Sequence, residues 1–404
     1  MIRLDLKAGR DASVRRRHPW LFSGAVARSE GDPSDGIAEV FSAGGERLAA
    51  GAYSPESQIV ARLWVFGSAP PPGRGLFDAR FEAARELRAA VLPPETTGFR
   101  GVHSEGDSCP GVVLDVYGDT GVLDLSTEGT ERWETDLAAA ARGAFGMNRL
   151  VVRRTGSVRD RGGDPRGRRH GLEPRPPADA GAGADLEERA PFTEHGLKFF
   201  ADFSAGQKSG FFLDQRDNRQ RTRALASGRR VLNLFSYSGG FSIAALAGGA
   251  VRAVDVDSSA SALNLAAEHR RENGFPVDPS DFVRSDVSRN LRARAASGET
   301  WDVVICDPPA FAKRKADVDA AARGYKDLNR LAMKLVTPGG FLLTCSCSGL
   351  VDSTLFQQIV FAAELESGAA FSLIARQGAG TDHPVSLDCP EGEYLKGLWL
   401  ARIG

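Results

Sequence analysis

One stretch, VLNLFSYSGGFSIAALAGGAVRAVDVD, constrains the fold more than any other part of the chain. Residues 231–235 form a short apolar run that is typical of a strand buried on both faces. A turn at 236–240 contains two glycines, and Ala-rich helical sequence follows over 241–247. A second apolar strand then covers 251–256. Strand, glycine turn, helix and strand in this order predict half of a doubly wound α/β sheet.

Ligands of such a unit lie over the carboxyl ends of the strands, where Gly239 and Gly240 would let one approach the backbone. Asp257 closes the second strand and can accept hydrogen bonds from ribose hydroxyls. The glycines lack the G-x-G-x-x-G spacing of dinucleotide enzymes, which favours a nucleoside ligand without a diphosphate. S-adenosylmethionine is the common ligand of that kind. Taken alone, the stretch fits a βα turn without a ligand equally well.

Composition sets the general class of the protein. A chain of 404 residues with 42% hydrophobic and 25% charged residues predicts two or three globular domains. No apolar run approaches the ~20 residues of a membrane span, and the N-terminus lacks the apolar region of a secretory signal. A cytoplasmic location and no membrane partner are therefore expected. Five cysteines without a C-x-x-C pair argue against a disulfide framework or a zinc site, so we expect no metal.

The net charge of −1 conceals two basic segments. Residues 1–30 hold seven Lys or Arg against three acids, and residues 153–175 hold eight Arg against three acids. Basic segments in a nearly neutral chain are compatible with a polyanionic partner. A solvated charged face explains the charge alone at least as well.

The first basic segment combines cations with aromatic side chains. Arg15, Arg16 and Arg17 can neutralise phosphates, and Trp20 can stack on a base. This pattern predicts an RNA-binding surface. Phe22, in contrast, is expected in the core.

Three domains are predicted along the chain. Residues 1–70 alternate apolar and polar positions between Gly, Pro and Ser punctuation, which indicates a small β domain. Residues 71–190 predict a small α+β domain without a catalytic constellation. Its last part, 156–190, is rich in Gly, Pro and Arg and is expected to be a mobile linker. Residues 191–404 predict the α/β domain.

Within the central domain, one predicted helix places its apolar residues on a single face. These residues, spaced by three and four, are Phe77, Phe81, Ala84, Leu87 and Val91. A second helix is expected over about 130–145, between strands near 112–117 and 121–125 and a strand at 150–153.

Three more strands of the α/β domain end in polar or reactive residues. They precede Asp286, the run Asp307-Pro308-Pro309, and the run Ser346-Cys347-Ser348. Because helical segments separate the strands, we expect a parallel sheet with helices on both faces. Active sites of such sheets lie at the strand ends. The rigid Pro-Pro loop suits recognition of a planar base.

Cys345 and Cys347 lie at the end of the fifth strand, where a deprotonated thiol could act as a nucleophile. Cations in the following segment could lower a thiol pKa, namely Lys313, Arg314, Lys315, Arg323 and Lys326. Buried cysteines more often act as small hydrophobic residues, which is our interpretation of Cys109, Cys306 and Cys389. Methylation at C5 of a pyrimidine requires a nucleophile that adds to C6, whereas methylation of an exocyclic nitrogen does not. Cys347 therefore distinguishes the two reactions.

The chain resembles, along nearly its full length, the bacterial large-subunit ribosomal RNA cytosine-C5 methyltransferases of the RlmI type. The matching stretches are RRRHPWLFSGAVAR, LAAGAYSPESQIVARLW, EGDSCPGVVLDVYGD, GQKSGFFLDQRDNR, VLNLFSYSGGFSIAAL, DPPAF, GYKDLN, TCSCSG and DHPVSLDCPEGEYLKG. The resemblance implies an N-terminal PUA domain that binds RNA, a central α+β domain and a class I methyltransferase domain. It also implies S-adenosylmethionine as cofactor, and ribosomal RNA or an assembly intermediate as partner.

The resemblance also implies roles for particular residues. The cofactor would be lined by Asn233, Phe235, Ser236, Ser238, Gly239 and Gly240. Its ribose would meet Asp257 and its adenine end Asp286, and the segment that holds Lys208, Gln215 and Arg216 would close over the methionine end. Asp307, also near the cofactor, would hold the cytosine edge, and Cys347 would be the nucleophile with Cys345 behind it.

Two departures and two alternatives stay open. Ala310 stands where the family often has lysine, with Lys313 as a candidate substitute in RNA binding, and the 156–190 segment is unlike the family. A nitrogen-directed RNA or DNA methyltransferase with a structural Cys347 is one alternative, and an RNA-binding assembly factor is the other. The sequence does not establish the oligomeric state, for which a homodimer is one candidate.

Overall fold

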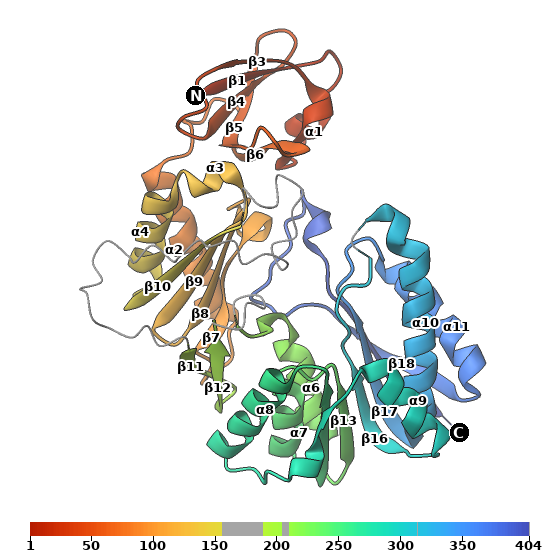
Figure 1. The fold of residues 1–404 in the computed structure, drawn as a ribbon. Coiled ribbons are helices and arrows are strands. Elements are labelled where there is room, and N and C mark those ends of the chain that lie inside the picture. The colour runs from red at the N-terminus through yellow and green to blue at the C-terminus, as the bar shows by residue number, and fades with distance from the viewer. Residues whose placement is uncertain (156–188, 204–209, 313, 404) are drawn as a thin grey trace. The chain divides into compact units, whose positions relative to one another are not determined.

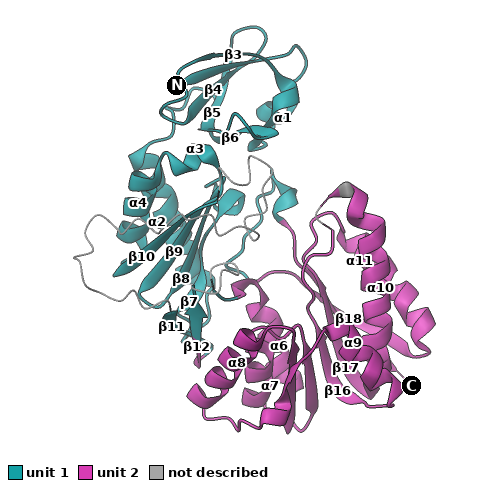
Figure 2. Cartoon of the chain, in the orientation of Figure 1, with its two compact units in different colours: residues 1–195, 200–211, 381–392 teal, residues 196–199, 212–380, 393–404 magenta. Residues whose placement is uncertain are grey.

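The computed structural model describes residues 1–155, 189–203, 210–312 and 314–403 (Figure 1). Within these ranges the chain divides into two compact units (Figure 2). Unit 1 comprises Met1–His195, Phe200–Phe211 and Thr381–Gly392, and unit 2 comprises Gly196–Phe199, Phe212–Gly380 and Glu393–Gly404. The linker expected over 156–190 lies outside the described residues as far as 188, and the β11 strand begins at Arg189. The domain boundaries at 70 and 190 remain predictions.

The first sheet of unit 1 has the strand order β2-β6-β5-β4-β1-β3. Its elements are β1 (Ile2–Leu6), α1 (Ala12–Arg15), β2 (Trp20–Phe22), β3 (Val26–Gly31), β4 (Ile37–Phe41), β5 (Arg47–Tyr53) and β6 (Ile59–Phe66). Alternation in β1 buries Ile2, Leu4 and Leu6 in the core of this sheet. Our prediction for Phe22 was wrong, because its side chain is 50% exposed. Leu21 is the buried residue of β2, and its neighbour in an extended strand points to the other side.

The second sheet of unit 1 has the order β10-β9-β8-β7. Its strands are β7 (Gly98–His103), β8 (Val112–Tyr117), β9 (Thr120–Leu125) and β10 (Arg149–Arg154). The helices of this part of the chain are α2 (Arg74–Val91), α3 (Glu128–Glu131) and α4 (Glu134–Phe145). A separate two-stranded sheet consists of β11 (Arg189–Glu194) and β12 (Leu197–Asp202). The single helix expected over 130–145 is two helices. The helix is interrupted at Trp133, which precedes the first residue of α4. The indole of Trp133 packs against Trp64 and Phe77, and its N–H donates a hydrogen bond of 3.0 Å to the carbonyl of Asp35.

Helix α2 buries a charged residue where the sequence suggested an apolar one. Leu87 is 37% exposed, and the buried face consists of Phe77, Phe81, Ala84 and Arg88. Spacings of four, three and four residues keep Arg88 in line with Phe77 at 3.6 residues per turn, whereas Leu87 is rotated away.

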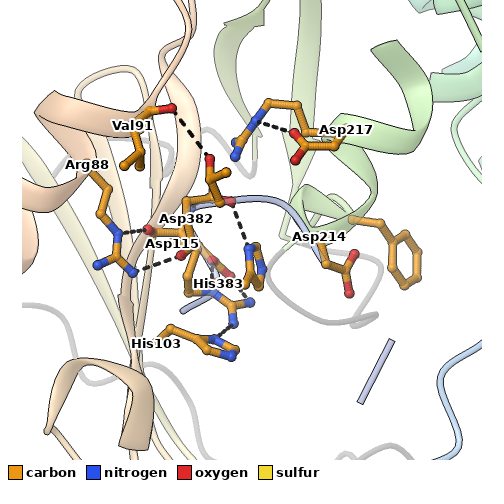
Figure 3. A network of polar contacts seen from close by, with 12 residues as sticks. Arg88, Val91, His103, Asp115, Asp214, Asp217, Asp382 and His383 are labelled. Carbon is orange, nitrogen blue, oxygen red and sulfur yellow. Dashed lines mark hydrogen bonds and ion pairs between the residues drawn. The ribbon is translucent and has the colours of Figure 1, made fainter. Parts of the chain in front are cut away.

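Arg88 is part of a buried polar network in unit 1 (Figure 3). Its guanidinium donates to the Asp107 carboxylate at 2.7 Å, to the carbonyl of Arg100 at 2.8 Å and to the carbonyl of Asp382 at 2.8 Å. The Asp382 carboxylate in turn accepts from the backbone N–H of Arg100 at 2.8 Å. Burial, together with the nearby Arg100 charge, holds the pKa of His103 well below its usual value. The central domain therefore contains a charged cluster that we did not predict.

The sheet of unit 2 has the order β15-β14-β13-β16-β17-β19-β18. The strands are β13 (Arg230–Leu234), β14 (Arg252–Asp257), β15 (Phe282–Arg284), β16 (Trp301–Cys306), β17 (Val336–Ser346), β18 (Ala370–Gln377) and β19 (Lys396–Ile403). The helices are α6 (Arg216–Leu225), α7 (Gly240–Ala247), α8 (Ala260–Glu272), α9 (Val287–Ala296), α10 (Val318–Lys334) and α11 (Ser353–Ser367).

The doubly wound α/β fold is confirmed, with one correction. Strands β13 to β17 pair in parallel, but β19 runs antiparallel to both of its neighbours, so the sheet is mixed. Two separate apolar clusters pack around this sheet, one with α9, α10 and α11 and the other with α6 and α7. Strand order reverses at β13, and ligands of such sheets bind beyond the carboxyl ends at that position. No helix in the described part of the chain is long and apolar enough to cross a membrane.

We predict that Arg88→Met destabilises the protein strongly, because it leaves the Asp107 carboxylate buried without its guanidinium. The expected loss is ~3–5 kcal/mol in the free energy of unfolding, measured by urea unfolding of the full chain. Arg85→Met on the same helix is the matched control, since its ion pair with Glu82 is exposed. Equal stability of the two variants would contradict a structural role for the network.

Candidate functional site

The turn after β13 has a strained backbone. Phe235, Tyr237 and Gly239 all have positive φ angles, of 58°, 46° and 76°. Such values are uncommon for residues other than glycine and persist only where surrounding contacts impose them. Here the N–H of Ser236 donates to the carbonyl of Val256 at 3.2 Å, and the N–H of Gly239 donates to the carbonyl of Ser236 at 2.9 Å. The turn is thus attached to the end of β14.

Asp257 orients the same turn through its carboxylate. One oxygen accepts from the N–H of Tyr237 at 2.9 Å, and the other accepts from the N–H of Ser259 at 2.9 Å. The side chain is half-buried. Because a carboxylate offers about four acceptor positions, Asp257 retains capacity for two hydroxyl groups of a ligand.

Asp255, two residues earlier, is fully buried beneath the turn. It accepts hydrogen bonds from Asn233 at 2.9 Å, Ser242 at 2.6 Å and Arg270 at 2.9 Å. Burial raises the pKa of this carboxyl, and the Arg270 guanidinium opposes that rise. Asp255 therefore supports the turn from within the fold, which leaves Asp257 as the acid that a ligand can reach.

The turn also contains polar atoms suited to a nucleoside ligand. Among the described residues, Asn233 Oδ1 and Ser236 Oγ are buried without a hydrogen-bond partner. Such atoms are costly unless a bound group satisfies them. A Cβ on Gly239 would approach Ala266 Cβ to 2.8 Å, so only glycine fits this close packing of α7 against α8. The residues present fit a bound S-adenosylmethionine.

Asp286 and the segment before α6 flank this turn. Asp286 is the exposed N-cap of α9, where its side chain accepts from the N–H of Arg289 at 2.9 Å, and it follows β15, the strand paired with β14. Gln215 and Arg216 are buried at the start of α6, and Gln215 Oε1 accepts from Asn218 at 2.7 Å. Lys208 lies outside the described residues.

The loops after β16 and β17 bring Asp307 and Cys347 to neighbouring strand ends. Cys306 is paired with Thr344 in the parallel ladder, so both loops leave the sheet at the same edge. The Cys347 thiol lies 3.9 Å from the carbonyl oxygen of Pro308. Ser348 joins the loops, because its hydroxyl accepts from the N–H groups of Phe311 at 3.1 Å and Ala312 at 3.2 Å.

Exposure separates Cys347 from the other cysteines. All five lie in the described residues, and Cys109, Cys306, Cys345 and Cys389 are buried, whereas Cys347 is intermediate. Burial raises the pKa of Cys109 to about 12 and of Cys345 well above the ordinary value. These buried thiols are unsuited to nucleophilic attack, and Cys347 is the accessible candidate.

Two of the cations expected to act on Cys347 have other partners. Lys326 donates to Glu366 at 2.8 Å, and Arg314 lies 3.4 Å from Asp317. Lys313, also a candidate RNA contact, lies outside the described residues.

The N-terminal basic cluster is only partly available to a polyanion. Arg15 is exposed but pairs with Asp11 at 2.7 Å and with Glu46. Arg16 and Arg17 are exposed, and neither forms an ion pair within the part of the chain that the structure describes. Trp20 is half-buried, and its indole N–H donates to Glu105 at 2.8 Å. The structure thus distinguishes Arg16 and Arg17 from Arg15.

Three potential metal ligands also meet near this cluster. Atoms of His18, Cys389 and Glu391 lie within 4.8 Å of one another. However, His18 Nδ1 accepts the N–H of Trp20 at 3.1 Å, which places the proton of a neutral ring on Nε2. A metal-bound histidine donates through its second nitrogen instead. The geometry favours a hydrogen bond from His18 to Glu391, whose atoms are 3.5 Å apart.

Comparison with known proteins defines the class of this one. The family described as S-adenosylmethionine-dependent methyltransferase matches residues 167–366, and the PUA-like domain family matches residues 4–66. A solved methyltransferase structure complexed with SAH has a TM-score of 0.81 at 22% identity and covers 99% of this chain and 100% of that one. A second, a SAM-dependent methyltransferase from Streptococcus mutans, has a TM-score of 0.81 at 20% identity, with the same coverage. The chain is thus built as a methyltransferase that uses S-adenosylmethionine and carries a PUA-like domain.

Closer relatives define the family. The proteins named ribosomal RNA large subunit methyltransferase I from Serratia proteamaculans and Photobacterium profundum are 40% and 42% identical to this chain. The alignments cover 98% of both chains in the first case and 97% of both in the second. The chain belongs to the family of these ribosomal RNA large subunit methyltransferases I.

We predict that Gly239→Ala weakens S-adenosylmethionine binding about tenfold or more, or ~1.4 kcal/mol, because its Cβ would force α7 away from Ala266. Gly298→Ala is the matched control. Gly298 also has a positive φ, of 72°, but a Cβ there meets nothing within 4 Å. Calorimetric titration with the cofactor measures both variants. Unchanged affinity in Gly239→Ala would exclude the turn from the cofactor site.

Proposed function

We propose that this protein transfers the methyl group of S-adenosylmethionine to C5 of a cytosine in large-subunit ribosomal RNA. The observation that carries the proposal is the placement of Cys347, the accessible cysteine, beside the Asp307-Pro308 loop. The names of the full-length relatives support ribosomal RNA as substrate. A cytoplasmic location and a homodimer remain predictions.

In the proposed reaction, the Cys347 thiolate forms a bond to C6 of the cytosine and moves electron density to C5. S-adenosylmethionine supplies an electrophilic methyl group, which C5 takes up while the methyl–sulfur bond breaks. A base then removes the C5 proton, the C5–C6 double bond forms again, and the C6–sulfur bond breaks. The thiolate is regenerated, so Cys347 is a true catalyst in this scheme.

Different residues at the strand ends would bind the cofactor and the cytosine. Asp257 would accept from the ribose hydroxyls, and the turn with Phe235, Ser238 and Gly240 would contact the rest of the cofactor. Asp307 would accept from the cytosine edge. Because a paired base must leave its stack to reach such a site, at a cost of ~a few kcal/mol, loops or incompletely assembled RNA are the favoured substrates.

We predict that Cys347→Ala abolishes methyl transfer but leaves cofactor affinity intact, because the thiol acts only on the pyrimidine. Transfer of a labelled methyl group to ribosomal RNA and calorimetric titration with S-adenosylmethionine measure the two properties. Cys345→Ala is the matched control, since this buried neighbour should affect stability before chemistry.

Two outcomes would favour the alternatives. Full transfer by Cys347→Ala would point to a nitrogen-directed methyltransferase, and absence of cofactor binding by the wild type would point to an assembly factor. A denaturation-stable adduct between the wild type and RNA containing 5-fluorocytosine would exclude both.

For the RNA-binding surface, we predict that Arg16→Gln with Arg17→Gln weakens RNA binding more than Arg15→Gln does. Arg15 already has two carboxylate partners, whereas Arg16 and Arg17 have none among the described residues. Each lost phosphate contact should reduce the slope of log K against log salt by about 0.7 to 0.9. Filter binding of RNA across a series of salt concentrations measures this slope. Identical slopes for all variants would contradict the RNA-binding role of Arg16 and Arg17.

A further inference from the structure

Lys396, the first residue of β19, is buried beside the loop that carries Cys347. It pairs with Ser346 across the antiparallel ladder of β17 and β19. Only 7% of the residue is exposed. Its ammonium donates to the carbonyl oxygen of Ser348 at 2.7 Å and to that of Tyr394 at 2.8 Å. The ammonium is thereby fixed against the residue that follows Cys347.

Burying a lysine in this position is energetically costly unless nearby groups compensate its charge. Lysine is rarely buried without a paired acid. Among the described residues Lys396 forms no ion pair with a carboxylate, and its ammonium contacts the carbonyls of Ser348 and Tyr394. Its two carbonyl partners are neutral and take up two of its three N–H bonds. Burial lowers the pKa of Lys396, and the nearby Cys347, Glu393 and Asp352 oppose that fall.

Two further ionisable groups near Cys347 carry no positive charge. Tyr325 of α10 has its pKa raised, mainly by burial, and burial likewise raises the pKa of Cys345 on β17, so both groups are held neutral. Asp307, after β16, contributes a negative charge that disfavours a thiolate at Cys345. Lys396 brings a positive charge to this region, because its ammonium is close enough to Cys347 for the two groups to interact electrostatically.

We propose that Lys396 is a positioning residue that holds Cys347 as a thiolate and orders the loop around it. Ionisation transfers the proton of the thiol to water, and the resulting thiolate is stabilised by the adjacent ammonium. This inference rests on the proposed function, because the thiolate is the group that would attack C6. It can nevertheless be tested without RNA.

The test is the pH dependence of Cys347 alkylation by iodoacetamide in the full chain, followed by peptide mass spectrometry. The other four cysteines are buried, so Cys347 should react first. For the wild type we expect an apparent pKa below the ordinary ~8.5 of cysteine. An apparent pKa at or above that value would overturn the proposal without any variant.

Substitutions separate charge from structure. Lys396→Met should raise the apparent pKa by about one unit or more, which slows alkylation about tenfold at neutral pH, whereas Lys396→Arg should keep it low. Lys334→Met, at an exposed position on α10, is the control and should leave the pKa unchanged. A lower melting temperature of Lys396→Met with an unchanged pKa would mean that Lys396 is only structural.

Activity measurements distinguish this inference from the proposed function. If both hold, Lys396→Met slows methyl transfer at neutral pH and recovers part of it as the pH rises. If Cys347→Ala still transfers methyl groups, the proposed function fails, although the alkylation data can still support the ion pair. If the pKa of Cys347 is insensitive to Lys396 while Cys347→Ala is inactive, the Lys396 proposal alone is overturned.

Discussion

The hydroxyl of Ser348 holds together the loops on which the candidate site depends. This hydroxyl accepts from the N–H groups of Phe311 and Ala312 and lies 3.0 Å from the hydroxyl of Tyr325. The backbone carbonyl of Ser348 accepts from the ammonium of Lys396. The loop after β16, helix α10 and strand β19 thus meet at one small residue. Since Cys347 directly precedes Ser348, three elements together set the position of the thiol, which is what the proposed nucleophile would need.

At the end of β14, two acidic residues have different structural roles because their surroundings differ. Asp255 and Asp257 are two residues apart on β14, so their side chains leave the strand on the same side. Asp255 lies inside the fold, where Arg270 balances its charge, and Asp257 lies beyond the last buried position, where backbone N–H groups orient it. The strained turn with Phe235 and Tyr237 is held between these two anchors.

Local patterns in the sequence were enough to predict the α/β fold, a small N-terminal β domain and the glycine turn, whereas the PUA-like assignment came from the family resemblance. They failed where long-range contacts decide. Arg88 is buried because Asp107 and Asp382 reach it from distant segments, and periodicity cannot show that. Phe22 is exposed because its neighbour Leu21 takes the inward position of a three-residue strand. Lys396 stands in a motif that was recognised, but its proximity to Cys347 arises only from the pairing of β19 with β17.

The segment Thr381–Gly392 gives this chain an unusual order of assembly. It is translated between β18 and β19, yet it belongs to unit 1, where Asp382 completes the bonding of Arg88 and Arg100. Domains generally fold during synthesis from the N-terminus onward. Here the first unit cannot complete its set of contacts until nearly the whole polypeptide has been synthesised. A nascent chain that stalls before this segment would expose an incomplete first half to chaperones and proteases.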